Sequence, residues 1–360
     1  MPVLSLLHLM LVSGMFQDFK YSFLVTLLCV GVAIWWGATT SMGIATAIFL
    51  VIVLGVMEVS LSFDNAVVNA SILKEMDERW QQLFLTVGIL IAVFGMRLVF
   101  PIVIVAVATG LGAWDVMSMA LNNPEEYSRH LMDSHAGIAA FGGMFLLLVF
   151  LSFMFDNEKD VHWIHSIEER MSAMGKLDVI SVLLALIMLF LLQEFLPISN
   201  ETRLTVLVAG LAGVVLYIAV SSIDVFFEDD AEGDAVVKSV KRNGLAGFLY
   251  LEVLDASFSF DGVIGAFAIT KDVVIIMLGL AIGAMFVRSM TVHLVHKGTL
   301  DEYIYLEHGA HYGIGALAFI MLFSIHYHIP EVITGLIGVT FIVWSIVSSL
   351  RHKKKLLAEA

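Results

Sequence analysis

The sequence predicts an all-α polytopic membrane protein with about ten transmembrane helices, arranged as two inverted repeats of five helices. Three observations predict this fold class. The 360 residues are 59% hydrophobic and only 14% charged, whereas a soluble domain carries about 25% charged residues. Several apolar runs approach or exceed the roughly 20 residues that cross a bilayer core as a helix. Finally, short motifs of the first half recur in the same order in the second half.

Hydropathy between charged, Gly-marked and Pro-marked breaks divides the chain into ten candidate spans. Their limits are 21–40, 43–72, 82–109, 136–155, 177–196, 203–224, 244–270, 273–296, 310–326 and 331–350. The predicted domains are an N-terminal interfacial segment at 1–20, transmembrane repeat A at 21–196, transmembrane repeat B at 203–350 and a basic cytoplasmic tail at 351–360.

Basic residues are distributed unequally between the two sets of loops that these spans create. Arg97 and Arg288 lie within spans, and the other 17 of the 19 lysines and arginines lie in loops, all but three of them in one set; the three exceptions are Arg129, Arg203 and Lys271. Because cytoplasmic loops carry the excess of Lys and Arg, we expect a multi-pass protein of the inner (cell) membrane with both termini in the cytoplasm.

Composition also excludes several function classes. The net charge of −14 leaves no basic surface for nucleic acid, so nucleic acid is not an expected partner. The single cysteine, Cys29, excludes an internal disulfide framework and a cysteine-based metal site. The acidic loop 156–176 and the acidic run 228–234 are expected to be solvated cytoplasmic linkers, since charge runs of this kind are usually exposed.

Four short motifs recur collinearly in the two halves and predict the inverted repeat. Glu58 to Asp64 matches Asp255 to Asp261, Gly88 with Arg97 matches Gly279 with Arg288, the motif opening at His135 matches that at His311, and the motif opening at Asp178 matches that at Glu331. Spans one to five therefore correspond to spans six to ten. An odd number of spans per repeat gives the copies opposite membrane orientations, which is typical of secondary transporters with a site near the bilayer midplane.

The first of these motifs places acids inside stretches that should lie within the bilayer. A charged side chain there costs roughly 2.5–3.5 kcal/mol on insertion scales, so intramembrane acids indicate a functional site by default. Acids six residues apart point about 240° apart on a regular helix. Either Glu58 and Asp64 serve different sides, or the helix opens between them, and the same holds for Asp255 and Asp261.

Other polar residues near these acids are accessory candidates. They are Ser60, Ser62, Ser257 and Ser259 in the motifs, Glu252 before the second motif, and Arg97 and Arg288 near the centres of their spans. Serine hydroxyls can bond freed backbone groups, so the serines favour helices that are broken at the midplane.

The charge balance of this constellation favours a cation. Two arginines against four carboxylates leave two uncompensated negative charges, which one divalent cation would balance. Carboxylate, hydroxyl and amide oxygens without thiols suit the hard ions Mn²⁺, Ca²⁺ and Mg²⁺. The structural alternative is a set of ion pairs that only lock the bundle. Repetition in both halves disfavours it, since buried ion pairs stabilise less than apolar packing.

At these residues the chain resembles the TerC family of integral membrane proteins, of the tellurium-resistance type, and is most similar to a longer branch described only as a domain of unknown function. The family's first motif, an acid followed six positions later by Asp-Asn-Ala, matches Glu58 and Asp64-Asn65-Ala66. Its second, Phe-x-x-Asp leading to Ala-Ile-Thr, is similar to the segment from Phe258 to Thr270. The resemblance covers most of 43–325.

This resemblance implies divalent-cation transport, chiefly manganese efflux. It places the metal at five residues: Glu58, Asp64, Asn65, Asp255 and Asp261. Gly262 stands where family members usually carry serine, Glu252 is an additional acid, and the chain has more spans than the usual member. These departures leave ion choice, stoichiometry and coupling open.

The expected function is a secondary transporter that moves a hard divalent cation, Mn²⁺ before Ca²⁺ or Mg²⁺, as an exporter. The alternative is a non-transporting membrane scaffold of a metal or tellurite stress-response complex. An enzyme is not expected, because the Tyr-Asp and Gly-x-Gly-Asp contexts of intramembrane aspartyl proteases and the Gly-x-Ser-x-Gly motif of serine hydrolases are absent. The expected partners are the metal ion and the lipid bilayer, and a homo-oligomer is compatible with the sequence.

Overall fold

The computed structural model describes residues 2–74, 76–88, 90–157, 159–175, 179–222, 244–297, 302–327 and 329–359. These residues form α-helices and two π-helical segments, and no β-strand occurs among them. The elements are α1 (Pro2–Thr39), α2 (Ile44–Leu61), α3 (Phe63–Leu73), α4 (Glu78–Leu83), η1 (Phe84–Gly88), η2 (Ile91–Val99), α5 (Phe100–Thr109), α6 (Ala113–Asn122), α7 (Pro124–Asp133), α8 (His135–Phe155), α9 (His165–Met174), α10 (Ile180–Phe195), α11 (Asn200–Ser221), α13 (Gly244–Ile269), α14 (Val273–Lys297), α16 (Leu306–Ser324) and α17 (Glu331–Glu359). The predicted all-α class is confirmed.

Seven of the described helical stretches are long and apolar enough to cross a membrane. They are Asp18–Thr39, Ile44–Leu61, Ile91–Thr109, His135–Phe155, Asn200–Ser221, Val273–Val295 and Ile333–Leu356. The other predicted spans also fall on helices, namely α10, α13 and α16. The chain is therefore a multi-pass membrane protein by length and composition, and the total of ten spans stays a prediction.

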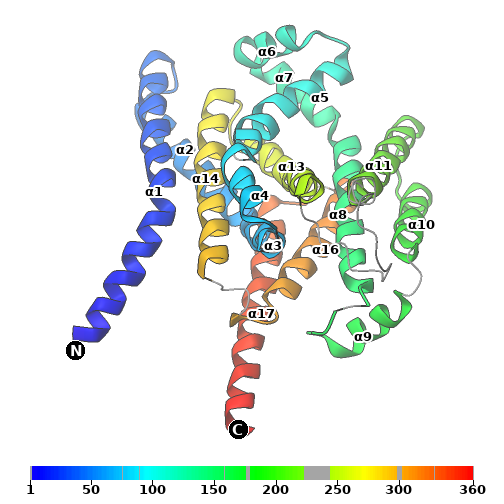
Figure 1. The fold of residues 1–360 in the computed structure, drawn as a ribbon. Coiled ribbons are helices and arrows are strands. Elements are labelled where there is room, and N and C mark those ends of the chain that lie inside the picture. Colours follow the sequence, from blue (N-terminus) through cyan, green and yellow to red (C-terminus); the bar gives the residue numbers. More distant parts are fainter. Residues whose placement is uncertain are drawn as a thin grey trace.

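The described residues form several apolar cores, of which two are large. The larger one surrounds α8 and includes residues of α10, α11, α16 and α17. The smaller one joins α1, α2, α5, the end of α13 and the start of α14. Because α8 is apolar on all sides it packs inside, and 72% of its candidate span is buried. In Figure 1 the two groups lie side by side, with α13 passing between them.

The two ends of the molecule carry different segments. Both chain termini lie at one end together with α9, and α6 and α7 lie at the opposite end (Figure 1). α1 runs unbroken from Pro2, so the predicted interfacial segment 1–20 joins the first span directly. The predicted basic tail 351–360 continues α17.

The prediction of a solvated linker at 156–176 is wrong for Glu168 and the helix that carries it, whereas most of the described residues of this segment are exposed or partly exposed. Residues 165–174 form α9, and Glu168 on it is 0% exposed. The cause is a set of hydrogen bonds from neighbouring backbone and side chains, which compensates the carboxylate for the loss of water. The acidic run 228–234 lies outside the described residues.

Candidate functional site

The first acidic motif spans the junction of two helices. α2 ends at Leu61, α3 begins at Phe63, and Ser62 between them has φ −107° and ψ 17°. The Ser62 hydroxyl donates to Glu58 Oε1 at 3.2 Å. Ser60 instead donates to the Val56 carbonyl one turn earlier and is exposed. The prediction that the helix opens between Glu58 and Asp64 is confirmed.

The second acidic motif lies within one continuous helix. α13 runs from Gly244 to Ile269 without interruption, so the break predicted between Asp255 and Asp261 is wrong. Ser257 Oγ donates to the Val253 carbonyl at 3.0 Å, and this bond adds to an intact turn instead of replacing a lost backbone bond. Ser259 Oγ is buried without a hydrogen-bond partner among the described residues. The side chain of Asp261 lies outside the described part of the chain.

Glu58 forms the centre of a tight packing site. The residue is 0% exposed, and its carboxylate makes an ion pair with Arg97 of η2. A Cβ at Gly262 of α13 or at Gly283 of α14 would collide with the Glu58 side chain. Glycine at both positions therefore makes room for this carboxylate. The second arginine nitrogen, Nη1, donates to the Ala92 carbonyl at 2.5 Å, inside a π-helical segment of the kind that often accompanies functional sites.

Asp64 faces a different pair of helices. It is 5% exposed, and its Oδ1 accepts a hydrogen bond from the Asn65 backbone N–H at 3.0 Å. A Cβ added at Gly338 of α17 would lie 3.0 Å from Asp64 Oδ2, and one at Gly313 of α16 would lie 3.5 Å from it. Glu58 faces α13 and α14, whereas Asp64 faces α16 and α17. The two acids serve different sides, and the helix also opens between them.

Asp255 is held by two amides of α3. Its Oδ1 accepts hydrogen bonds from Asn65 Nδ2 at 2.5 Å and from Asn69 Nδ2 at 3.2 Å. An ionised carboxylate only accepts hydrogen bonds, so both amide nitrogens must face it and both amide oxygens must point away. Both oxygens are buried and have no hydrogen-bond partner among the described residues. Sequence analysis missed Asn69, although it follows Asn65 by four residues and so shares its face of the helix.

A small polar cavity lies at this cluster. Its volume is about 30 Å³, and its lining includes Asn65, Asn69, Asp255, Arg97, Arg288 and Thr291. This is room for one occupant of about the size of a water molecule. The lining contains two arginines. Arg97 is paired with Glu58, whereas Arg288 makes no ion pair with a described acid.

Glu252 lies at the edge of this region, beside η1. It is 5% exposed, and neither carboxyl oxygen has a hydrogen-bond partner among the described residues. A Cβ at Gly88 would lie 2.6 Å from Glu252 Oε1. Glu252 therefore packs against the backbone of the segment that leads to Arg97.

The predicted metal residues do not converge on one point within the described part of the chain. No group of three or more His, Cys, Asp or Glu residues there is close enough to hold a metal ion. Of the five residues that the resemblance indicates, the structure brings Asn65 and Asp255 together. Glu58 faces Gly262 of α13 and Gly283 of α14, and Asp64 faces α16 and α17.

The comparison with known families gives one match. A family model with the description "Protein of unknown function (DUF475)" matches residues 63–356, which include Asp64, Asn65, Asn69 and Asp255. No curated protein and no solved structure matches the chain.

Proposed function

The chain belongs to the DUF475 family of proteins of unknown function, so we infer its function from the site. We propose that it is a secondary transporter that exports a hard divalent cation across the cell membrane. Mn²⁺ is the first candidate, on the TerC resemblance, with Ca²⁺ and Mg²⁺ as the alternatives. Both termini would lie in the cytoplasm, as the loop charges predict.

The observation that carries this proposal is the cavity beside Asp255. Asp255 and two asparagines with unpartnered amide oxygens, Asn65 and Asn69, line a space for a single small occupant. Hard divalent cations bind carboxylate, amide carbonyl and water oxygens at about 2.0–2.6 Å. The charge of Arg97 is compensated by Glu58. Arg288 would supply positive charge near Asp255 when no cation is bound.

The packing of the helices supports the inverted repeat within this proposal. In the predicted repeat, α2 corresponds to α13, η2 to α14, α8 to α16 and α10 to α17. The contact of α2 with α14 should therefore have a counterpart between α13 and η2, and the contact of α8 with α10 should have one between α16 and α17. All four contacts occur, as do the corresponding contacts of α1 with α2 and of α11 with α13. The first helices of the two repeats, α1 and α11, do not follow this symmetry. α1 packs on α14, whereas α11 packs on α8 instead of η2, the counterpart of α14.

Metal flux into proteoliposomes tests the proposal. The unmodified chain should move Mn²⁺, and Asp255→Asn and Asp64→Asn should each reduce the flux at least tenfold. The matched control is Glu302→Gln, which removes an exposed carboxylate that pairs with the exposed Lys353, and its flux should be unchanged. Normal flux in both aspartate variants would exclude the assignment.

The scaffold remains the second candidate function, because of the Glu58–Arg97 pair. A buried ion pair between α2 and η2 is what a purely structural lock would contain. A folded chain that moves no Mn²⁺, Ca²⁺ or Mg²⁺ in the same vesicles would favour the scaffold over the transporter.

A further inference from the structure

Three helices, α8, α16 and α17, share a cavity at one end and a polar cluster at the other. The cavity has a volume of about 290 Å³, and its lining includes His135 at the start of α8, Ser324 at the end of α16 and Thr334 near the start of α17. His326, Tyr327 and Leu61 also line it. Phe153 of α8, His308 of α16 and Trp344 of α17 lie toward the opposite ends of the same helices, at the polar cluster.

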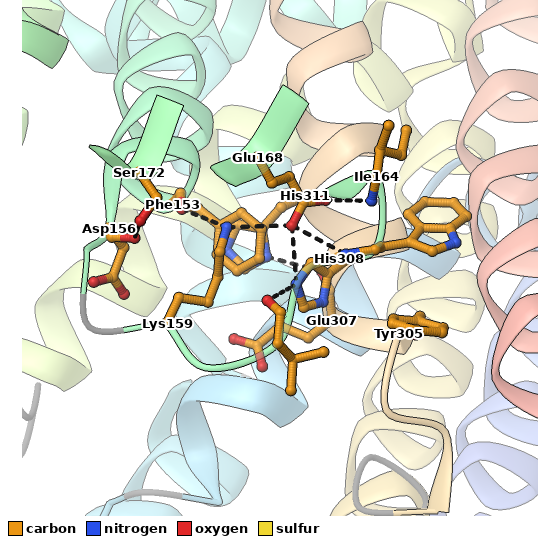
Figure 2. A network of polar contacts seen from close by, with 12 residues as sticks. Phe153, Asp156, Lys159, Ile164, Glu168, Ser172, Tyr305, Glu307, His308 and His311 are labelled. Carbon is orange, nitrogen blue, oxygen red and sulfur yellow. Dashed lines mark hydrogen bonds and ion pairs between the residues drawn. The ribbon is translucent and has the colours of Figure 1, made fainter. Parts of the chain in front are cut away.

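Glu168 of α9 is the hub of that cluster. Its Oε1 accepts a hydrogen bond from the Ile164 backbone N–H at 3.1 Å, and its Oε2 accepts one from the Trp163 backbone N–H at 3.2 Å. These bonds hold the last residues of the α8–α9 connection against the Glu168 carboxylate. Figure 2 shows Glu168 pointing into the space between this connection and α16.

Three side chains complete the set of donors around Glu168. Lys159 Nζ lies 3.5 Å and His308 Nε2 lies 3.3 Å from Glu168 Oε2, and the Tyr312 hydroxyl donates to Oε1 at 3.2 Å. His308 Nε2 also lies 2.8 Å from the Val161 carbonyl. We name Lys159, Glu168, His308 and Tyr312 the Glu168 cluster; it ties the α8–α9 connection to α16.

Aromatic rings surround the Glu168 cluster on the α8 and α17 sides. Lys159 Nζ lies 4.1 Å from the centre of the Phe153 ring, and that ring stacks on His311 at 3.8 Å. Trp163 packs against Trp344 of α17, with ring centres 5.0 Å apart. The side chains of Glu168 and Lys159 are consequently 0% and 8% exposed, so these two charged groups are shielded from water.

Asp64 lies between the cavity and the Glu168 cluster. Gly313, which faces Asp64, directly follows Tyr312 of the cluster along α16. Leu61, next to the helix break at Ser62, lines the 290 Å³ cavity. The carboxylate thus has a cavity toward one end of the three helices and a buried polar cluster toward the other.

We propose that the Glu168 cluster is the closed gate of the transport path at the end of the molecule where both termini lie. This inference rests on the proposed function. Separating charged and polar groups returns them to water, which offsets much of the lost interaction. Such a contact can open and close, whereas an apolar seal would expose surface with no compensation. Opening would move the α16–α17 pair away from the α8–α9 connection and give Asp64 access to the second side.

Thiol labelling tests the gate without requiring transport. Replacing the single cysteine by Cys29→Ser gives a background without thiols. Ser345→Cys then places a reporter on α17, where the native side chain is 0% exposed and contacts Gly309 of α16. We expect a maleimide to label this reporter slowly, and at least tenfold faster after Glu168→Gln. Tyr312→Phe, which removes one donor and little volume, should give a smaller increase and decides the matter if Glu168→Gln does not fold.

The control and the contrary outcomes separate the gate from the transport function. Glu169→Gln changes the next residue of α9, whose exposed carboxylate pairs with exposed His165, and it should leave the labelling rate unchanged. Folded Glu168→Gln and Tyr312→Phe proteins that label no faster than this control, in a chain that moves Mn²⁺, would overturn the gate alone. A lack of metal flux in the unmodified chain would overturn the proposed function.

Discussion

Arg97 and Glu58 form a buried ion pair that joins the π-helical segment η2 to the end of α2. Both residues are almost fully buried, with side-chain exposures of 5% and 1%. The remaining carboxylate oxygen, Oε2, has no hydrogen-bond partner among the described residues. The pair therefore holds two buried charges together close to the break at Ser62, and one carboxylate oxygen remains without a described hydrogen-bond donor.

Removing one member of this pair should destabilise the protein more than removing both. Glu58→Gln leaves Arg97 buried without its counter-charge, for which the expected cost is about 3–5 kcal/mol. Glu58→Gln combined with Arg97→Met removes both charges and should recover most of that loss. Thermal unfolding in detergent measures the order. A double variant that unfolds below the single one would show that the pair is not a compensated unit.

Asn69 should contribute to ion affinity although sequence analysis did not identify it. Asn69→Ala shortens a side chain that lines the cavity, and it removes an unpartnered amide oxygen and one of two described donors to Asp255. We expect Mn²⁺ binding to weaken about tenfold, equivalent to about 1.4 kcal/mol. Isothermal titration measures it, with Asn122→Ala as the control, since Asn122 is exposed and bonds to Ser118 within α6. Equal affinities in the two variants would remove Asn69 from the site.

The sequence predicted the features that follow from composition and local pattern. Apolar run lengths gave the helices, and the serines with the six-residue acid spacing gave the break at Ser62. The same reasoning failed for α13, because local signals cannot report that Gly262 is packed against a glutamate from another helix. A glycine required for close approach and a glycine that weakens a helix look identical in one sequence.

Long-range charge partners were likewise beyond the sequence. A count of charges gave two arginines against four acids, but only tertiary structure shows that Arg97 takes Glu58. The prediction for Glu168 also failed because it rested on neighbouring residues alone. Its acidic surroundings indicate a solvated loop, whereas donors from α16, far along the chain, make its burial favourable.

Gly262 should not tolerate even a methyl group. In Gly262→Ala the new Cβ would meet Glu58 Oε2, so either α13 or the ion pair with Arg97 has to shift, with an expected cost of about 1–3 kcal/mol. Gly31→Ala is the matched control within a helix, since nothing lies within 4 Å of its added Cβ. The control should be neutral or up to about 1 kcal/mol more stable. Comparable unfolding temperatures for the two variants would contradict the close approach.

Acid should weaken the Glu168 cluster in a defined pH range. Burial alone would raise the pKa of Glu168, but the hydrogen bond with His308, the Ile164 backbone N–H and the charge of Lys159 together lower it from 4.5 to about 2. The folded-state pKa therefore lies below the unfolded one. The stability that this difference supplies, roughly 3 kcal/mol, is fully present above about pH 4.5 and is lost as the pH falls toward 2.

Glu168→Gln should remove this pH dependence. At pH 7 the variant should unfold at a lower temperature than the unmodified protein, because Lys159 loses its buried partner. The difference should shrink as the pH falls from 4.5 toward 2, since the unmodified carboxylate becomes protonated over that range. Glu169→Gln, at the exposed neighbour, should follow the unmodified protein throughout. If the difference in unfolding temperature between Glu168→Gln and the unmodified protein stayed constant from pH 4.5 to pH 2, another group would control the acid stability.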